Sequence, residues 1–298
     1  STGHYNKAIP LFEKSVGDAA NDVGGAGDLE VGGSCNNVAN MYYAQGQYDK
    51  AQPLYERAIA LTEPKWPRHR NLADSQQGLA NIYVMQQKYD LAEPLYKKAL
   101  EIREEALGET HPNVSHSLYS LAFFYNIQRK YSQAEPLFER ALKLRLETLG
   151  DQHPDVLMSM HGVAGLRRLQ HRYEEALEMF NRCLKLREEV MGPGHPDVAS
   201  SLDGIGEVYM DTNKPDEALP VWDRSYRLRE AAGVSHPVQI AGSYLAVAST
   251  LMGLRRWDDA EKLLTRALNI CQKSEPFWQA GITTAQNRLA EVKRQRGR

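Results

Sequence analysis

The chain has few cysteines and no long apolar segment. Its 298 residues include three cysteines, Cys35, Cys183 and Cys271, which lie far apart. An odd number of widely spaced cysteines argues against a disulfide framework and against a zinc site. We therefore interpret them as small buried hydrophobic residues and expect a reducing, cytoplasmic location. No apolar run approaches the roughly 18 residues that a membrane-spanning helix needs, and no signal-peptide pattern opens the sequence.

An excess of charge of either sign is also missing. Lys and Arg number 36 and Asp and Glu number 38, so the formal net charge is −2. A nucleic-acid-binding domain normally carries a concentrated basic surface, and a protein that binds an anionic membrane surface needs clustered basic residues. We therefore expect neither nucleic acid nor a membrane among the partners.

Motifs that carry known catalytic chemistry are absent from the sequence. It contains no H-E-x-x-H, no G-x-S-x-G, no P-loop and no C-x-x-C. The adjacent pairs Glu174-Glu175 and Glu188-Glu189 are the kind of carboxylates that usually face solvent on a helix. We predict a protein that is not an enzyme and that has no cofactor and no bound metal, although an unfamiliar site would leave no motif.

What the sequence does contain is a repeat. Residues of the same type recur every 42 positions: Tyr89, Tyr131 and Tyr173; Ala92, Ala134, Ala176, Ala218 and Ala260; Arg103, Arg145, Arg187 and Arg229. The dipeptides that begin at His111, His153 and His195 are all His-Pro and keep this period, and the one at His236 comes one residue early. A fixed period of this length predicts an array of stacked helical units.

Each unit has the pattern of two helices. The first carries small, aliphatic and tyrosine residues, as in Leu79-Ala80-Tyr83, and the second presents an apolar face with a 3.6-residue period. We expect Gly108, Gly150 and Gly192 to end second helices and the prolines of the His-Pro pairs to begin the next helix. We place Pro53, Pro94, Pro136 and Pro220 near the first turn of second helices, where a missing N–H costs least.

The pattern divides the chain into four parts. Residues 1–23 resemble a second helix without its first, and 24–34 are rich in glycine and predict a flexible linker. Residues 35–273 give six helix pairs, and 274–298 give a polar capping helix. A lone N-terminal helix would leave Phe12 uncovered, so a homodimer formed through this helix is one alternative.

Two ladders of repeated side chains require an interpretation. Histidines of successive repeats are separated by at least about 8–10 Å, the distance between packed helices, whereas zinc ligands lie about 2 Å from one ion. We therefore interpret them as residues that cap loops. The second ladder, which we call the arginine ladder, consists of Arg103, Arg145, Arg187 and Arg229. We interpret these arginines as structural residues near helix C-termini, with Glu105, Glu147 and Glu189 as their partners.

The repeated pattern resembles that of a known family. The sequence Leu/Val-Ala-x-x-Tyr, followed by Tyr-x-x-Ala-x-Pro-Leu-Tyr/Phe-x-x-Ala-Leu, resembles the tetratricopeptide repeat. The loops, such as Leu149-Gly150-Asp151-Gln152-His153-Pro154, resemble those of the kinesin light chain variety. Similar units occur in nephrocystin-type proteins, in bacterial repeat proteins and in sensor arrays of signalling ATPases. The resemblance implies an all-α, right-handed superhelix whose first helices line a concave groove that binds extended peptides.

The groove-facing positions of the family can be carried over to this sequence. They are Asn36, Asn40, Tyr43, Asp74, Gln77, Asn81, Met85, His116, Tyr119, Phe123, Asn126, His161, Arg168, Asp203 and Glu207, followed by Met210, Asp211, Leu245 and Ser249. Asparagine and glutamine offer both donors and acceptors to a peptide backbone. Tyr119 and Phe123, one turn apart, form a candidate aromatic anchor. The alternative is that these residues are the ordinary polar faces of exposed helices.

The charge of these positions narrows the expected ligand. Arg168 is the single cation among them, whereas Asp203, Glu207 and Asp211 are acidic. A clamp for acidic peptide tails needs several cations because each carboxylate requires a paired charge. We therefore predict a scaffold whose peptide ligand has a basic end near the fifth and sixth pairs. The alternatives are a self-assembly module and the sensor part of a larger signalling ATPase.

Overall fold

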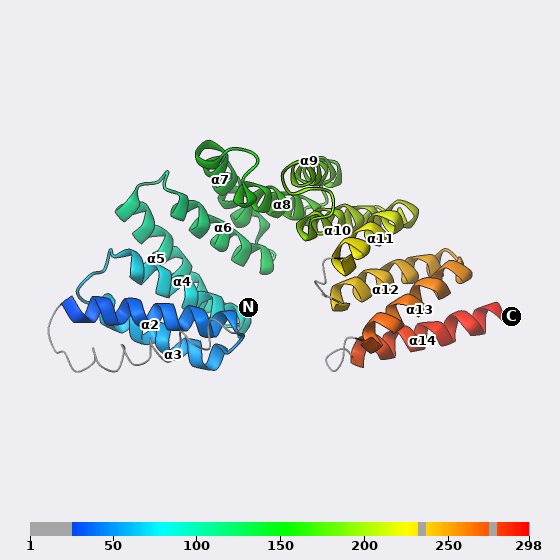
Figure 1. Cartoon of the computed structure of the whole chain (residues 1–298), viewed down its shortest axis with the longest axis horizontal. Helices are drawn as coiled ribbons and strands as arrows, with labels where there is room; N and C mark the ends of the chain where they lie inside the picture. Colours follow the sequence, from blue (N-terminus) through cyan, green and yellow to red (C-terminus); the bar gives the residue numbers. More distant parts are fainter. Residues whose placement is uncertain (1–25, 232–236, 274–278, 298) are drawn as a thin grey trace. The chain divides into compact units, whose positions relative to one another are not determined.

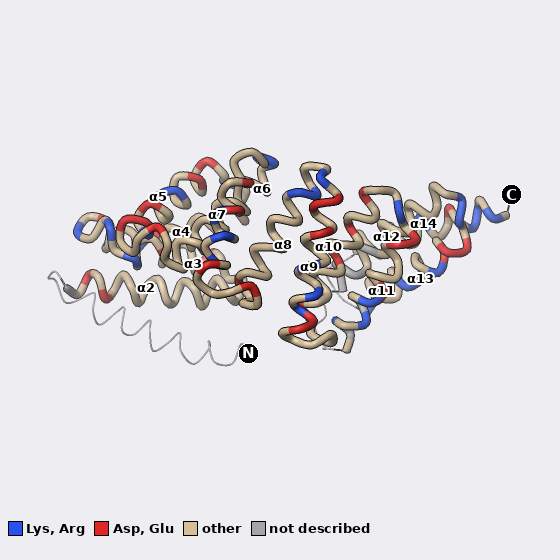
Figure 2. The backbone as a smooth tube through the Cα atoms, turned by 90° about the horizontal axis from the view of Figure 1, so that it is seen from above, with Lys and Arg blue, Asp and Glu red and all other residues tan. Residues whose placement is uncertain are grey.

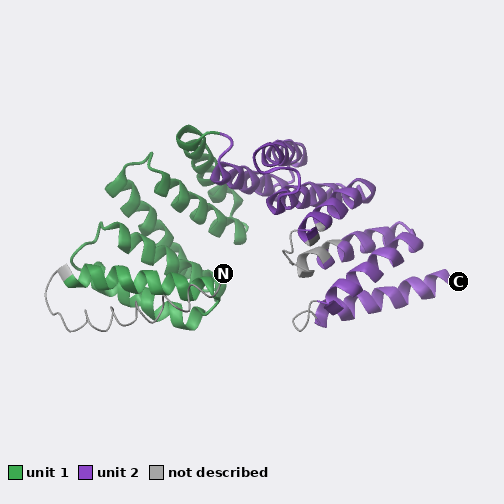
Figure 3. Ribbon diagram, viewed as in Figure 1, with its two compact units in different colours: residues 1–150 green, residues 151–298 purple. Residues whose placement is uncertain are grey.

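The computed structural model describes residues 26–231, 237–273 and 279–297. Every regular element within these ranges is an α-helix. The chain divides into two compact units, which meet between Gly150 and Asp151 (Figure 3). Acidic and basic residues are interspersed along the helices of each unit (Figure 2). Among the described helices, none combines the length and the apolar character required to cross a bilayer.

The described part of unit 1 consists of the helix pairs α2 to α7, which Figure 1 labels. They are α2 (Ala26–Ala44) with α3 (Tyr48–Thr62), α4 (Arg70–Met85) with α5 (Tyr89–Leu107), and α6 (Pro112–Ile127) with α7 (Tyr131–Leu149). The two helices of each pair pack against each other, and α3 and α5 also pack against the first helix of the next pair. These second helices are therefore covered on two sides.

Unit 2 repeats this arrangement and ends in a single helix. Its pairs are α8 (Pro154–Leu169) with α9 (Tyr173–Met191), α10 (Pro196–Asp211) with α11 (Pro215–Ala231), and α12 (Pro237–Gly253) with α13 (Trp257–Lys273). The last helix, α14 (Gln279–Arg296), packs on α13 and α12. Its Ala285 and Val292 are buried, while Lys293 and most other polar side chains face outward.

Repeated alanines allow the helices of a pair to approach closely. Ala92, Ala134 and Ala176 are fully buried. On five of the second helices a large aromatic residue lies four positions after the alanine and fills the space beside it; these residues are Tyr55, Tyr96, Phe138, Phe180 and Trp222. On α13 this position is Leu264. Close packing of small and large side chains gives the interior its density. The three cysteines are buried, as expected for small core residues.

The predicted caps are present at both ends of the helices. His111, His153 and His195 are the N-caps of α6, α8 and α10, and each Nδ1 accepts a hydrogen bond from the backbone N–H two residues later. A proline follows at the first helical position in all three cases. His69 caps α4 in the same way without a proline. The glycines at 108, 150 and 192 have φ between 78° and 86° and end the second helices.

The predicted glycine-rich linker is wrong for residues 26–34, because α2 begins at Ala26 and continues through them. The glycines there serve close packing instead of flexibility. A Cβ at Gly32 would lie 2.7 Å from Oγ1 of Thr62 on α3, and one at Gly33 would lie 3.1 Å from Nδ2 of Asn71. The predicted partial repeat at 1–23, with Phe12, lies outside the described residues, as does His236.

The prolines of the second helices lie deeper than predicted. Pro53, Pro94, Pro136 and Pro220 each occupy the sixth residue of their helix, in the second turn. None of the four is buried. A proline here removes one hydrogen bond of the helix, and its position away from the core leaves the freed carbonyl oxygen accessible to water.

Candidate functional site

Several predicted groove residues of unit 1 hold the helix pairs together. Oδ1 of Asn40 on α2 accepts a hydrogen bond of 2.5 Å from the hydroxyl of Tyr55 on α3. Asn81 on α4 and Tyr96 on α5 repeat this contact at the same distance. Burial raises the pKa of both tyrosines, so both remain protonated donors. In each case an asparagine stands fifteen positions before a tyrosine and satisfies its hydroxyl group.

Two other predicted residues of unit 1 serve the arginine ladder. The buried guanidinium of Arg103 on α5 donates to Oδ1 of Asp74 at 2.5 Å and also to Oε1 of Gln77, both on α4. It reaches Oγ of Ser117 on the next pair as well. Asn36 is similarly internal, because its Oδ1 accepts a hydrogen bond from Ser75 at 3.2 Å. Asn36 and Gln77 are therefore buried structural residues.

The predicted partners of the arginine ladder are wrong. The four ladder arginines, Arg103, Arg145, Arg187 and Arg229, are 2–7% exposed and lie inside the stack. They bind polar groups of first helices, such as Ser115 for Arg145 and Ser201 for Arg187. Glu105, Glu147 and Glu189 instead form surface ion pairs with Arg68, Lys143 and Lys185. A buried guanidinium requires buried partners, which the surface glutamates are too exposed to supply.

The remaining predicted residues of unit 1 are distributed between core and surface. Tyr119 is half-buried, packs edge-on against Phe138 at 5.2 Å and lies under the guanidinium of Arg145. Phe123 and Met85 are 49% and 58% exposed. Three more predicted residues complete the set: Tyr43, whose ring packs at a tilt against that of Tyr48, exposed His116 and half-buried Asn126. Tyr119 and Phe123 therefore do not form a joint exposed anchor.

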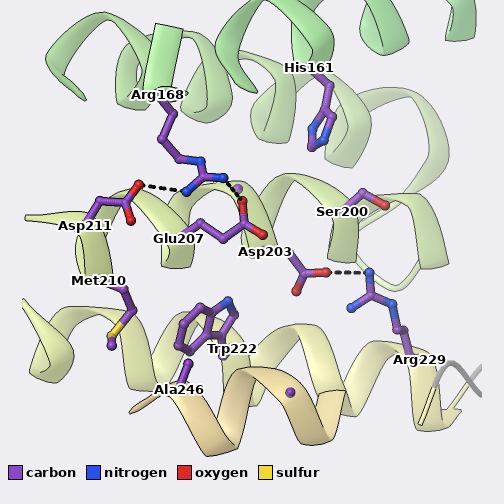
Figure 4. Close-up of a pocket in the computed structure, with 12 residues that line it drawn as sticks. His161, Arg168, Ser200, Asp203, Glu207, Met210, Asp211, Trp222, Arg229 and Ala246 are labelled. Atoms are coloured by element: carbon purple, nitrogen blue, oxygen red, sulfur yellow. Dashed lines mark hydrogen bonds and ion pairs between the residues drawn. The ribbon is translucent and has the colours of Figure 1, made fainter. Parts of the chain in front are cut away.

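In unit 2, by contrast, the predicted residues meet in one cavity of about 610 Å³ (Figure 4). We call it the unit 2 pocket. Its lining residues are His161, Arg168, Ser200, Asp203, Gly204, Glu207, Met210, Asp211, Trp222, Arg229, Gly242 and Ala246. They come from the first helices α8, α10 and α12 and from α11. Leu245 and Ser249 of α12 are not among them.

Two sets of ion pairs organise the unit 2 pocket (Figure 4). Arg168 of α8 reaches Glu207 at 3.1 Å and Asp211 at 2.7 Å, both on α10. Arg229 of α11 lies 2.6 Å from Asp203. Three carboxylates and two guanidinium groups leave a formal charge of −1. Arg168, the single cation of the predicted groove, is therefore already paired within the chain.

The pocket also changes the proton affinity of two side chains. Burial, together with the nearby Arg187, lowers the pKa of His161 to about 4, so this imidazole is neutral at pH 7. Desolvation within the pocket raises the pKa of Glu207, and the nearby carboxylates of Asp203 and Asp211 raise it further, whereas the guanidinium of Arg168 lowers it. No group of His, Cys, Asp and Glu side chains in the described part of the chain is arranged to hold a metal ion.

Trp222 is the largest of the pocket residues that the sequence did not indicate as groove-facing. It is 5% exposed, and its Nε1 has no hydrogen-bond partner in the described structure. A signal was available, because Trp222 occupies the repeat position of Tyr96 and Phe180, and Glu207 stands fifteen residues before it, where Asn81 precedes Tyr96.

Comparison with known proteins agrees with this architecture. One profile of the tetratricopeptide repeat matches residues 33–105, 71–122, 114–189 and 157–231, and a second matches 240–274. No curated protein matches the chain.

Solved structures of similar fold include two of the kinesin light chain kind. BtubC (BKLC) from P. vanneervenii is 23% identical, with a TM-score of 0.63 over 78% of this chain and 94% of its own. The putative kinesin light chain repeats from Podosopora anserina are 23% identical, with a TM-score of 0.58 over 68% and 96%. A Rap protein in complex with Competence and Sporulation Factor is 14% identical, with a TM-score of 0.60 over 99% and 85%. At these identities the likeness establishes the fold alone.

Proposed function

Because the chain belongs to the tetratricopeptide repeat family, we propose that it is a non-catalytic scaffold for protein–protein interaction. In this proposal an extended peptide segment of a partner lies along the first helices of unit 2, and the unit 2 pocket is its main contact site. One face of a partner helix is the alternative ligand, but the polar lining of the pocket favours the exposed backbone groups of an extended segment.

One observation carries the proposal. Six residues selected as groove-facing from the sequence line a single cavity together with a buried tryptophan whose N–H is unpartnered; they are His161, Arg168, Asp203, Glu207, Met210 and Asp211. A cavity with a few convergent polar groups is the usual form of a binding site. Several corresponding residues of unit 1 are instead bound to structural side chains, such as Asn40 to Tyr55 and Asp74 to Arg103, so they support binding less well.

The solved structures support a binding role for this fold in general. One of those with a similar fold is a complex of a Rap protein with Competence and Sporulation Factor. The carboxylates of the unit 2 pocket are engaged with Arg168 and Arg229, which suits recognition better than proton transfer. We also propose a reducing, cytoplasmic location, because the three cysteines are buried thiols.

A peptide selection tests the proposal. The full chain is immobilised and used to select from a phage-displayed library of random 12-residue peptides, and the enriched peptides are synthesised with blocked ends. We expect enrichment of related sequences that bind in calorimetry with micromolar dissociation constants. A library that shows no enrichment over uncoated beads would contradict the scaffold role.

A further inference from the structure

We propose that the unit 2 pocket selects a peptide with one lysine or arginine whose cationic group binds Glu207 and Asp211, while a neighbouring backbone carbonyl accepts the N–H of Trp222. This inference rests on the proposed function and names the chemistry of its ligand. Three observations support it: a break in the repeat register, a concentration of unpartnered polar atoms, and the balance of charge.

The register break concerns the contact between the two helices of a pair. Asn40 and Asn81 accept the hydroxyl groups of Tyr55 and Tyr96, fifteen residues further along the chain. Glu207 likewise stands fifteen residues before Trp222. Glu207 nevertheless binds Arg168, at 3.1 Å. The indole N–H of Trp222 is consequently left without an acceptor such as Asn40 and Asn81 supply to Tyr55 and Tyr96.

Unpartnered polar atoms are concentrated in this pocket. The described residues contain seven buried side-chain nitrogen or oxygen atoms without a hydrogen-bond partner, and three of them belong to residues that line it. They are Nδ1 of His161, Nε of Arg168 and Nε1 of Trp222. The last two are donors only. An unmade buried hydrogen bond carries the full desolvation penalty of its group, so the pocket favours a ligand that brings acceptors such as peptide carbonyls.

Figure 4 shows how these groups face one another. The nitrogen-bearing edge of Trp222 points toward Asp203 and Glu207 on α10, and Met210 lies beside the ring. The indole nitrogen is enclosed and lies against Gly206 of α10, where a built Cβ would be 2.4 Å from it. The proposal therefore includes a rearrangement: the ligand cation displaces Arg168 from Glu207, and this displacement opens the N–H of Trp222 to the ligand carbonyl.

The two arginines of the pocket differ in how readily a ligand cation can replace them in their ion pairs. The Arg229 side chain is 8% exposed, and both its partner Asp203 and Ser225 hold it. Arg168 is 20% exposed, whereas its partners Glu207 and Asp211 are 50% and 36% exposed. An incoming cation therefore meets Glu207 and Asp211 from the solvent side. The net charge of −1 favours this cation over an anion.

The size of the cavity agrees with such a ligand. A volume of about 610 Å³ accommodates a lysine side chain with its flanking backbone, within the range of roughly 300–1,000 Å³ that is common for ligand pockets. A polyamine supplies cations without carbonyl acceptors. Spermidine therefore separates recognition of charge alone from recognition of a basic peptide.

Calorimetry on the peptides selected from the random library tests the cation. Each is resynthesised with its basic residue replaced by norleucine, which keeps the apolar stem, and by glutamate. We expect norleucine to weaken binding about 10- to 100-fold, as for loss of a hydrogen bond between charged groups, and glutamate to weaken it further. The Glu207→Gln and Asp211→Asn chains should each lose about tenfold, whereas Glu178→Gln, a matched exposed site on α9, should not change.

The indole resonance of Trp222 tests the carbonyl. The chain has four tryptophans, and the ¹⁵N–¹H indole signal that disappears in Trp222→Phe identifies this one. We expect a downfield proton shift when the basic peptide is added, and little shift with spermidine.

The outcomes separate the two claims. If no peptide is selected, both this inference and the scaffold role are wrong. If selected peptides have no common basic residue, tolerate norleucine, prefer glutamate or leave the Trp222 signal unmoved, this inference is wrong and the scaffold role stands. If circular dichroism shows that the Glu207→Gln chain is unfolded, the norleucine peptides and the Asp211→Asn chain still test whether the pocket binds a cation.

Discussion

Gly206 of α10 faces the indole ring of Trp222 on α11 so closely that a Cβ at position 206 would lie 2.4 Å from Nε1. Gly204 meets the ring of Phe180 and Gly78 meets that of Tyr55 at the same distance. Real Cβ contacts are not that short, so the aromatic ring would have to move. The glycines of the first helices thus set the positions of the large aromatic residues, including the one in the unit 2 pocket.

The first prediction concerns this packing. Gly206→Ala should destabilise the chain by about 1–3 kcal/mol, because an added methyl group overpacks a filled site. Gly165→Ala is the matched control, since residue 165 is a helical glycine with no atom within 4 Å of the built Cβ. It should stabilise the chain by about 0.5–1 kcal/mol. Urea denaturation measures both, and equal effects would refute the packing argument.

The second prediction concerns the cation inside the pocket. Arg168→Met should tighten binding of a basic peptide about tenfold, equivalent to about 1.4 kcal/mol, because it frees Glu207 and Asp211 from their internal partner. Arg140→Met, which removes a guanidinium paired with Glu104 in unit 1, is the control and should leave affinity unchanged. Weaker binding to Arg168→Met would show that Arg168 itself contacts the ligand.

The third prediction concerns pH. His161 has a pKa of about 4 in the folded chain, below the ordinary value of about 6.5. Between these values the unfolded state binds the proton and the folded state does not, so stability falls as the pH is lowered through this window. The difference corresponds to about 3 kcal/mol at pH 4.

The variant His161→Gln removes this contribution. The loss of unfolding free energy between pH 6.5 and 4 should therefore be smaller in His161→Gln than in the natural chain. His171→Gln changes an exposed histidine and serves as the control. Identical pH profiles for the natural chain and His161→Gln would contradict the assignment of a buried neutral imidazole.

The fourth prediction concerns the caps. His153→Ala should cost about 0.5–2 kcal/mol, the usual effect of losing an N-cap acceptor, because Nδ1 accepts the N–H of Asp155 at 3.1 Å. Asparagine supplies an equivalent acceptor, so His153→Asn should recover at least half of the loss. Thermal unfolding followed by circular dichroism measures the difference. If alanine and asparagine behave alike, the imidazole does not stabilise α8 as a cap.

The fold could be predicted in detail because the repeat reports the same local structure several times. The caps at His111, His153 and His195 follow from their position before proline, and the buried alanines follow from their period. The prediction of a flexible linker was wrong for residues 26–34 for a physical reason. Glycine signals both flexibility and close packing, and only the neighbouring Thr62 decides between them.

The site was less predictable than the fold. Sequence position indicates the helix face, but it does not indicate whether a polar side chain is already paired with another. Asn40, Asp74 and Gln77 lie on the predicted face and bind Tyr55 or Arg103. Trp222 was missed because its ring belongs to the core and only part of the residue borders the pocket. Whether a polar side chain is already paired, and whether a core residue also borders the pocket, depends on contacts between helices.

Hydrogen–deuterium exchange of the full chain with a selected basic peptide tests the central claim most directly. If the peptide binds in the unit 2 pocket, the largest gain in protection will fall in α10 and α11, with smaller gains in α8 and α12. At a peptide concentration near the dissociation constant, this gain will be much smaller in Glu207→Gln. Protection confined to α4 and α6, around the exposed Met85 and Phe123, would contradict the account and place the ligand on unit 1.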